Sequence, residues 1–325
     1  MNKKVSAIIA AAFLLFFAVT AQAEPTELNY RLKWLFNTSV AGDIYADSGG
    51  FFAKAGLKVN VKEGSPEKNA ISELELGRAD FGCASADQVI RALEKGAKLV
   101  VLAQIFQISP MQWIYRANQP EIKTLADLKG RSIGITFGGN DETVMNTLLA
   151  QAGIAKKDVK LTGVRFDFSP FLTGKVDVWP VYRNTQGVLL QDKMAQAGEQ
   201  VRFLDPAKFG VNFVANSVIT SKKMLHDQPQ LVEKFLAALL QGWEAAMNPA
   251  NEASVLAAVK HLEKDGQDDI MRKQLAVTRE LVQPAPSSKI GALDIPAWQQ
   301  TEAIMLREKQ IEKAVGVKKK LVVRK

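Results

Sequence analysis

Residues 28–61 read LNYRLKWLFNTSVAGDIYADSGGFFAKAGLKVNV, and their pattern predicts a strand, a polar turn, a helix and a second strand. Apolar side chains alternate along residues 28–34, which is the period of a strand. A helix is expected over residues 41–54, and Gly56 can adopt the left-handed conformation that ends it before the chain extends again. In a βαβ unit of this kind the ligand lies beyond the carboxyl end of the strand.

That strand end carries aromatic and hydrogen-bonding side chains together. Trp34 offers a flat apolar face, and Asn37 and Thr38 offer polar groups three and four residues later. A small ligand with a ring and polar edges suits such a combination. The sequence therefore predicts a ligand-binding turn at residues 34–39.

Strand-like and helix-like segments alternate along the chain in two series. The first places strands at 58–61, 80–83 and 99–103 and helices at 66–76 and 87–95. The second places strands at 132–135, 161–164, 176–179 and 201–204 and helices at 142–151 and 185–197. This alternation predicts an α/β protein with two lobes, each a doubly wound sheet. From Gln228 onward the pattern is helical, and those helices are expected to pack on the first lobe.

Four stretches of the chain resemble the NMT1/THI5-like and SsuA-like family, the periplasmic substrate-binding proteins of ABC importers. They are residues 28–61, ELELGRADFGCASADQVIRALEKGAKLVVLAQI at 73–105, LADLKGRSIGI at 125–135 and FLTGKVDVWPVYRNTQ at 171–186. The resemblance implies a type II periplasmic binding protein fold, with lobe 1 formed by residues 24–112 and 218–325, lobe 2 by 113–217, and a hinge of two crossing segments near 111–116 and 212–220.

The same resemblance implies the protein's partners. They are a small-molecule ligand and an inner-membrane ABC permease with its ATPase, and the family's function needs no cofactor. A monomer is expected. Because the family binds nitrate, sulfonates, thiamine pyrimidines, flavins and other small molecules, the resemblance does not identify the ligand.

The N-terminus predicts export. Lys3 and Lys4 precede an apolar run over residues 5–19, and Ala21-Gln22-Ala23 forms a small-x-small cleavage site, so residues 1–23 are expected to be a signal peptide and the mature protein periplasmic. A retained anchor is the alternative, but the run is shorter than the about 20 residues that span a membrane. The formal charge of +8 is spread out, and export argues against nucleic acid. The single cysteine, Cys83, is expected to be a buried small hydrophobe.

Three further turns are predicted to face the cleft. Ser85 begins a helix whose free N–H groups could receive a ligand oxygen, although it could equally only cap that helix. A Gly-rich turn opens the next lobe's helix, and its backbone donors could approach a ligand closely. The residues assigned to it are Gly138, Gly139 and Asn140.

The last turn follows a strand and combines aromatic and amide groups. Trp179 and Tyr182 suit stacking on a flat ring, and Asn184 can bind an amide or amino edge, although Trp179 could instead be a core residue. In the thiamine-pyrimidine branch the matching run resembles YWNHE, with which Tyr182 and Asn184 agree, whereas Gln186 replaces the acidic residue. We therefore predict a thiamine-pyrimidine-like or related planar heterocycle as the ligand.

Three alternatives remain open. An alkanesulfonate, taurine or nitrate binder would need converging backbone donors or an Arg, for which Arg183 is the nearby candidate, and Asp141 and Glu142 would repel an anion. A sensory module would normally be fused to a membrane or signalling segment. Fungal thiamine pyrimidine synthases resemble this chain, but their pattern has catalytic His and Lys residues and a Cys-rich run where this chain has Val40, Ala84, Gln88 and NFVANSV at 212–218. The only histidines, His226 and His261, lack metal-ligand spacing and are expected on helix surfaces, so no catalysis and no metal are predicted.

Overall fold

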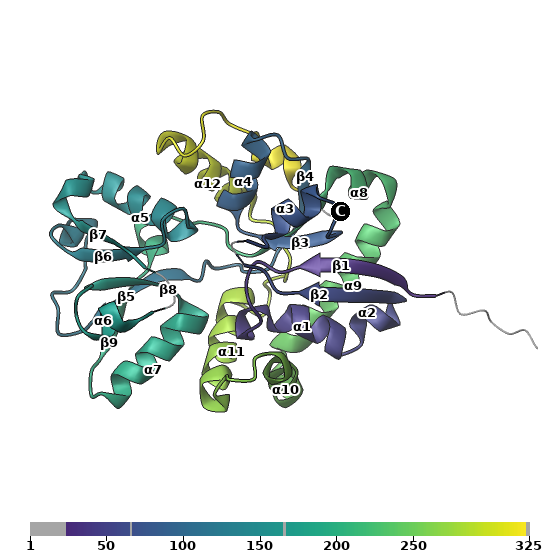
Figure 1. Ribbon diagram of the computed structural model, residues 1–325, viewed down its shortest axis with the longest axis horizontal. Helices are drawn as coiled ribbons and strands as arrows, with labels where there is room; N and C mark the ends of the chain where they lie inside the picture. Colours follow the sequence, from purple (N-terminus) through teal and green to yellow (C-terminus); the bar gives the residue numbers. More distant parts are fainter. Residues whose placement is uncertain (1–23, 66, 165–166, 323–325) are drawn as a thin grey trace, which may run out of the picture.

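The computed structural model describes residues 24–65, 67–164 and 167–322. The predicted signal peptide lies outside these residues. The described chain is organised around two separate sheets, seen side by side in Figure 1, with helices on the faces of each. The predicted α/β class is confirmed.

The first sheet has the strand order β2-β1-β3-β10-β4. Its strands are β1 (Thr26–Arg31), β2 (Leu57–Lys62), β3 (Phe81–Ala84), β4 (Leu99–Gln104) and β10 (Ser217–Ser221). β1 is parallel to both β2 and β3, whereas β10 is antiparallel to β3 and β4, between which it lies. Every residue of β3 and β4 is buried, as expected for strands covered by helices on both faces.

The second sheet repeats this plan with the order β7-β6-β8-β5-β9. Its strands are β5 (Met111–Arg116), β6 (Ser132–Ile135), β7 (Lys160–Gly163), β8 (Val178–Tyr182) and β9 (Val201–Leu204). β6 is parallel to β7 and β8, and β5 is antiparallel to β8 and β9. The chain therefore passes from one sheet to the other between β4 and β5 and returns between β9 and β10. The predicted lobe boundaries at residues 112 and 217 stay a prediction.

Helices cover both sheets. Those before β10 are α1 (Ala41–Ser48), α2 (Phe51–Lys54), α3 (Ala70–Glu75), α4 (Ala86–Glu94), α5 (Asn140–Gln151), α6 (Ser169–Leu172) and α7 (Val188–Gln196). Those after it are α8 (Lys222–Asp227), α9 (Pro229–Met247), α10 (Glu252–Leu262), α11 (Asp268–Val282) and α12 (Ile295–Arg307). Short helical turns are η1 (Thr38–Val40), η2 (Leu125–Leu128), η3 (Lys156–Asp158), η4 (Arg183–Gly187), η5 (Pro206–Phe209), η6 (Pro249–Asn251) and η7 (Val317–Lys320).

Several predicted elements differ from the structure. The helix expected over residues 66–76 is α3 at Ala70–Glu75, and the one expected over 185–197 begins as the turn η4 before α7. The helix expected over residues 41–54 is divided into α1 and α2 by Gly49 and Gly50, because Gly50 has a φ of +74°, which a helix interior does not accommodate. The predicted left-handed end at Gly56 is confirmed by its φ of +64°. The strand expected over 176–179 instead runs from Val178 to Tyr182, which moves the turn after it toward the C-terminus.

The C-terminal helices pack on the first lobe, as predicted for α9. Phe235 of α9 stacks on Phe81 of β3 at a centroid distance of 3.7 Å. A Cβ added to Gly42 of α1 would lie 2.0 Å from the Trp243 ring of α9, so only glycine permits this approach. The contact also buries Asp43, whose carboxylate accepts hydrogen bonds from Tyr30 Oη (2.8 Å) and Trp243 Nε1 (3.2 Å).

Burial dominates the ionisation of this carboxyl group. It raises the pKa of Asp43 to about 7, against the opposing effect of the two hydrogen bonds. Cys83 is buried in the same core, as predicted, and burial raises the pKa of its thiol. Its role as a small hydrophobe is consistent with both observations.

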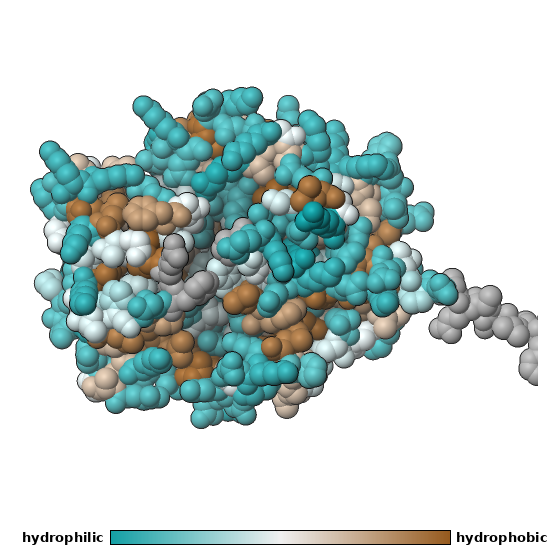
Figure 2. Space-filling model, viewed as in Figure 1, coloured by the Kyte–Doolittle hydropathy of each residue, from teal (hydrophilic) through white to brown (hydrophobic). Residues whose placement is uncertain are grey.

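The exterior is largely hydrophilic. On the face shown in Figure 2, hydrophilic side chains predominate and hydrophobic residues form separate patches. Among the described helices, none is both long and apolar enough to cross a membrane.

Candidate functional site between the two lobes

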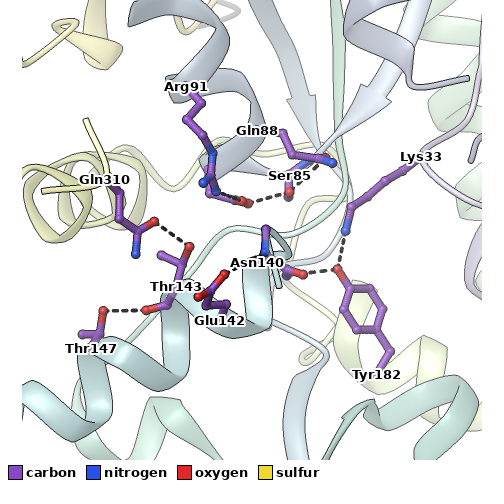
Figure 3. A network of polar contacts seen from close by, with 12 residues as sticks. Lys33, Ser85, Gln88, Arg91, Asn140, Glu142, Thr143, Thr147, Tyr182 and Gln310 are labelled. Carbon is purple, nitrogen blue, oxygen red and sulfur yellow. Dashed lines mark hydrogen bonds and ion pairs between the residues drawn. The ribbon is translucent and has the colours of Figure 1, made fainter. Parts of the chain in front are cut away.

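Four turns follow the carboxyl ends of β1, β3, β6 and β8, two from each sheet. Figure 3 shows side chains from all four in one region between the lobes, with Lys33 and Ser85 coming from the first sheet and Asn140 and Tyr182 from the second. The four turns predicted to form the site are thus brought together. The carboxyl ends of parallel strands are where α/β sheets bind ligands.

Lys33 and Tyr182 join the two lobes. Lys33 Nζ donates a hydrogen bond to Tyr182 Oη at 2.5 Å, and Asn140 Nδ2 approaches the same oxygen at 3.4 Å (Figure 3). Burial opposes the charge on Lys33, but the Tyr182 hydroxyl and the Asp87 carboxylate outweigh it and raise the pKa of Lys33 above its usual value. Lys33 is therefore protonated at neutral pH.

Ser85 is the cap of α4. Its hydroxyl donates to Asp87 Oδ1 at 2.6 Å, and its backbone N–H donates to Gln88 Oε1 at 3.1 Å. Asp87 is paired in turn with Arg91 at 2.7 Å. Ser85 is 1% exposed, so the structure supports the capping interpretation of this residue.

The Gly-rich turn before α5 is stabilised by two acidic side chains of that helix. The backbone N–H of Thr136 donates to Asp141 Oδ2 at 2.5 Å, and that of Gly138, whose φ is +78°, donates to Glu142 Oε2 at 2.7 Å. Gly139 is the N-cap residue, where an added Cβ would lie 2.4 Å from Asp141 Oδ1. Burial raises the pKa of Asp141 to about 6, although the Thr136 N–H opposes the shift. These acids occupy backbone donors that were predicted to face a ligand.

The turn after β8 is a single π-helical turn, η4. Asn184 within it is fully buried, and its Nδ2 donates to Thr278 Oγ1 of α11 at 2.9 Å. Because the Thr278 hydroxyl already donates to the carbonyl of Gln274 at 2.8 Å, it can only accept from Asn184, which fixes the orientation of the amide. Within the described residues the Asn184 Oδ1 atom is buried without a hydrogen-bond partner. Isolated π-helical turns are frequent at functional sites.

The remaining residues of the predicted site differ in how exposed they are and in what they contact. Trp34 is partly exposed after β1, and its carbonyl accepts from the N–H of Gly64. Asn37 caps η1, accepting from the N–H of Ser39 at 2.8 Å, and the buried Thr38 donates to Gln274 Oε1 at 3.1 Å. Trp179 is 1% exposed among the core side chains of the second lobe, so its alternative interpretation as a core residue is the one the structure supports.

Helix α11 connects both lobes at the site and was missed as a site element. Gln274 contacts Thr38 of the first lobe through Oε1 and the carbonyl of Thr185 in η4 through Nε2 at 3.2 Å. Arg183, the predicted anion-binding candidate, is paired with Glu280 of α11 at 3.0 Å. Lys33 was also missed, because a lysine beside an apolar strand is typical of a solvent-facing residue.

A groove of about 510 Å³ adjoins the network drawn in Figure 3. Arg91 of α4 and Glu142 of α5 belong to both its wall and that network. Thr143 Oγ1 donates to Gln310 Oε1 at 2.6 Å across it. The other lining residues are Asn146, Leu149, Ala150, Ile154, Ala155, Lys156 and Glu308.

Metal coordination has no support in the part of the chain that the structure describes. No group of three or more His, Cys, Asp or Glu side chains there could hold a metal ion. His226 of α8 and His261 of α10 are exposed, as predicted.

Sequence comparison finds a matching family model and several similar proteins. The profile of a family described as NMT1/THI5 like matches residues 37–253. A putative thiamine biosynthesis protein of Haemophilus influenzae is 28% identical over 90% of each chain. The riboflavin-binding protein RibY of Chloroflexus aurantiacus is 25% identical over 89% of this chain and 83% of its own. The formylaminopyrimidine-binding protein of Halalkalibacterium halodurans is 21% identical over 83% and 81%.

Structural comparison gives the same fold. The periplasmic aliphatic sulphonate binding protein SsuA of Escherichia coli superimposes with a TM-score of 0.72 over 93% of both chains, at 18% identity. At this identity the likeness extends to the two-lobed architecture and not to the ligand.

Proposed function

The chain belongs to the NMT1/THI5-like family, and on that premise we propose that it is the solute-binding protein of an ABC importer, binding a small planar nitrogen-containing heterocycle between its lobes. The protein acts in the periplasm after loss of residues 1–23, as a monomer, and delivers its ligand to an inner-membrane permease with its ATPase. The vitamin-related ligands named for the relatives in H. halodurans and C. aurantiacus support a heterocycle.

The observation that carries this proposal is the meeting of four strand-end turns around the Lys33–Tyr182 contact. Trp34 and Tyr182 supply partly exposed aromatic faces from opposite lobes. Asn140 and the unpaired oxygen of Asn184 supply polar groups from the second lobe. A ligand that contacts both lobes stabilises the closed arrangement more than the open one, and that difference is the signal available to a transporter.

Closure requires two lobes joined by segments that can bend. We assign residues 24–112 and 218–325 to one lobe and 113–217 to the other, so that the two passages of the chain between the sheets form the hinge. Helix α11 contacts both lobes through Gln274, and its polar contacts with η4 are those that opening would break.

Catalysis is not part of the proposal. Val40 and Ala84 are buried apolar residues where the pyrimidine-synthase pattern places ionisable side chains, and Gln88 is hydrogen-bonded to the backbone of Ser85. General acid–base chemistry needs a titratable group within reach of the substrate. These positions supply none.

An alkanesulfonate is the second candidate ligand, because a lysine lies in the cleft. Lys33 offers a cation, but the backbone donors of Thr136 and Gly138 are occupied by Asp141 and Glu142. A sulfonate would have to displace two acidic side chains to reach them. The heterocycle therefore remains the preferred ligand.

A thermal-shift screen of the protein without residues 1–23 tests the proposal. Aminopyrimidines, flavins, taurine and alkanesulfonates are compared, and a ligand at 100 times its dissociation constant stabilises the protein by about 2.7 kcal/mol. We expect a shift with a heterocycle that is lost in Trp34→Ala and Tyr182→Ala. The matched control is Tyr45→Ala, since Tyr45 contacts Ser254 outside the cleft. A shift with sulfonates alone would contradict the proposal.

A further inference from the structure

Lys33 has more hydrogen-bonding capacity than its surroundings use. An ammonium group carries three donors and no acceptor, and Tyr182 Oη accepts one of them. Among the described residues no carboxylate oxygen lies within the 4.0 Å ion-pair distance of its Nζ. A partly buried ammonium group with unused donors needs a further acceptor, because desolvation without compensation is costly.

The surroundings favour a neutral acceptor over an anion. Asp87 and Asp141 both interact electrostatically with Lys33, so negative charge is already present around the cation. The N-terminus of α5 is neutralised by Asp141 and Glu142, and that of α4 by the Ser85, Asp87 and Gln88 contacts. An anionic ligand would meet carboxylates where it needs donors, whereas a carbonyl oxygen requires only the free donors of Lys33.

We propose that Lys33 selects ligands by binding a neutral carbonyl oxygen, so that the ligand is an oxo-substituted heterocycle of the lactam or imide type. This inference rests on the proposed function and specifies the ligand class. The ligand oxygen takes up donors of Lys33, while the aromatic faces of Trp34 and Tyr182 contact the ring. A heterocycle with only an amino group at that position would direct its N–H donors toward the N–H donors of Lys33.

The Tyr182 hydroxyl uses only one donor of Lys33. It comes from the opposite lobe, and its oxygen lies 2.5 Å from Lys33 Nζ. The ligand oxygen therefore takes a donor that Tyr182 does not use. It follows that the ring of Tyr182 contributes to affinity and that its hydroxyl is dispensable.

A matched pair of ligands tests this inference by isothermal titration calorimetry. The probes are 4-amino-5-hydroxymethyl-2-methylpyrimidine and its 4-oxo counterpart, which differ at one ring substituent. We expect the wild-type protein to bind the oxo probe at least tenfold more tightly. Lys33→Met should lower the affinity for the oxo probe at least tenfold and the affinity for the amino probe less than threefold. Tyr182→Phe should bind the oxo probe within threefold of wild type.

The matched control is Lys234→Met, since Lys234 is exposed on α9. It should leave both affinities unchanged, and near-ultraviolet circular dichroism verifies that each variant is folded. A wild-type preference for the amino probe, or a Lys33→Met variant that retains the oxo preference, would overturn the inference and leave the proposed function in place. A wild-type protein that binds neither pyrimidine would overturn the inference, and one that also shows no thermal shift with any heterocycle of the screen would overturn the proposed function itself.

Discussion

Asp43 gives the most quantitative prediction. Its carboxyl group is buried between α1 and α9 with a pKa of about 7, whereas the value expected for the unfolded chain is 3.8. A raised acid pKa means that the folded state binds the proton more tightly, so the group favours folding at low pH. That stability is lost as the pH rises from about 4 to about 7. The difference corresponds to about 4 kcal/mol when the loss is complete.

Asp43→Asn removes this dependence. An asparagine oxygen can accept the hydrogen bonds from Tyr30 Oη and Trp243 Nε1, and its amide supplies a donor, as the protonated carboxyl does. Between pH 5 and pH 8 the wild-type protein should lose about 2 to 3 kcal/mol of stability relative to the variant. The variant should therefore be the more stable protein at pH 8.

Urea unfolding at pH 5, 6, 7 and 8, followed by tryptophan fluorescence, measures both proteins. Asp141 and Glu263 also have raised pKa values, of about 6 each, but they are present in both proteins and cancel in the difference. Near-ultraviolet circular dichroism verifies the packing of Trp243 in the variant. Stability curves that remain parallel from pH 5 to pH 8 would refute the reasoning.

Three other substitutions follow from the packing. Gly42→Ala should lower the free energy of unfolding by about 1 to 3 kcal/mol, because its Cβ would overlap the Trp243 ring. An unchanged midpoint of urea unfolding would contradict the close approach of Gly42 to Trp243. Trp179→Phe should lower the melting temperature but change the ligand affinity less than twofold, because Trp179 is a core residue. A loss of binding without a loss of stability would show instead that Trp179 contacts the ligand. Thr278→Val should lower the free energy of unfolding in urea by about 1 to 3 kcal/mol, because Asn184 Nδ2 loses the hydroxyl that accepts its hydrogen bond, whereas Thr278→Ser should retain most of the stability.

The fold could be predicted from local patterns because each lobe is built from alternating short segments. Residues 111–116 were expected to be extended, and they form β5. The division between α1 and α2 was missed, because two adjacent glycines are compatible with either a helix or a turn until Gly50 is seen at positive φ. Sequence periodicity also placed β8 too early, because the pattern of Val178 to Tyr182 is nearly all apolar.

The meeting of the four turns of the candidate site could be predicted from the sequence, whereas the placement of several of their side chains could not. The four strand ends do meet, since their position follows from topology. Whether a polar residue faces a ligand or its own helix depends on contacts that the sequence does not contain, and Ser85 proved to be a cap. Lys33 and Gln274 were missed because their partners lie on the opposite lobe or on a distant helix.

The position of β10 has a consequence for how the protein is made. This strand lies between β3 and β4, yet it is synthesised more than a hundred residues after them. While the ribosome is still translating the residues between β4 and β10, no strand connects β3 with β4. The sheet to which these two buried strands belong is then incomplete. The sheet that begins in the N-terminal third of the chain is therefore complete only after strands β5 to β9 have been synthesised and β10 has been added up to Ser221.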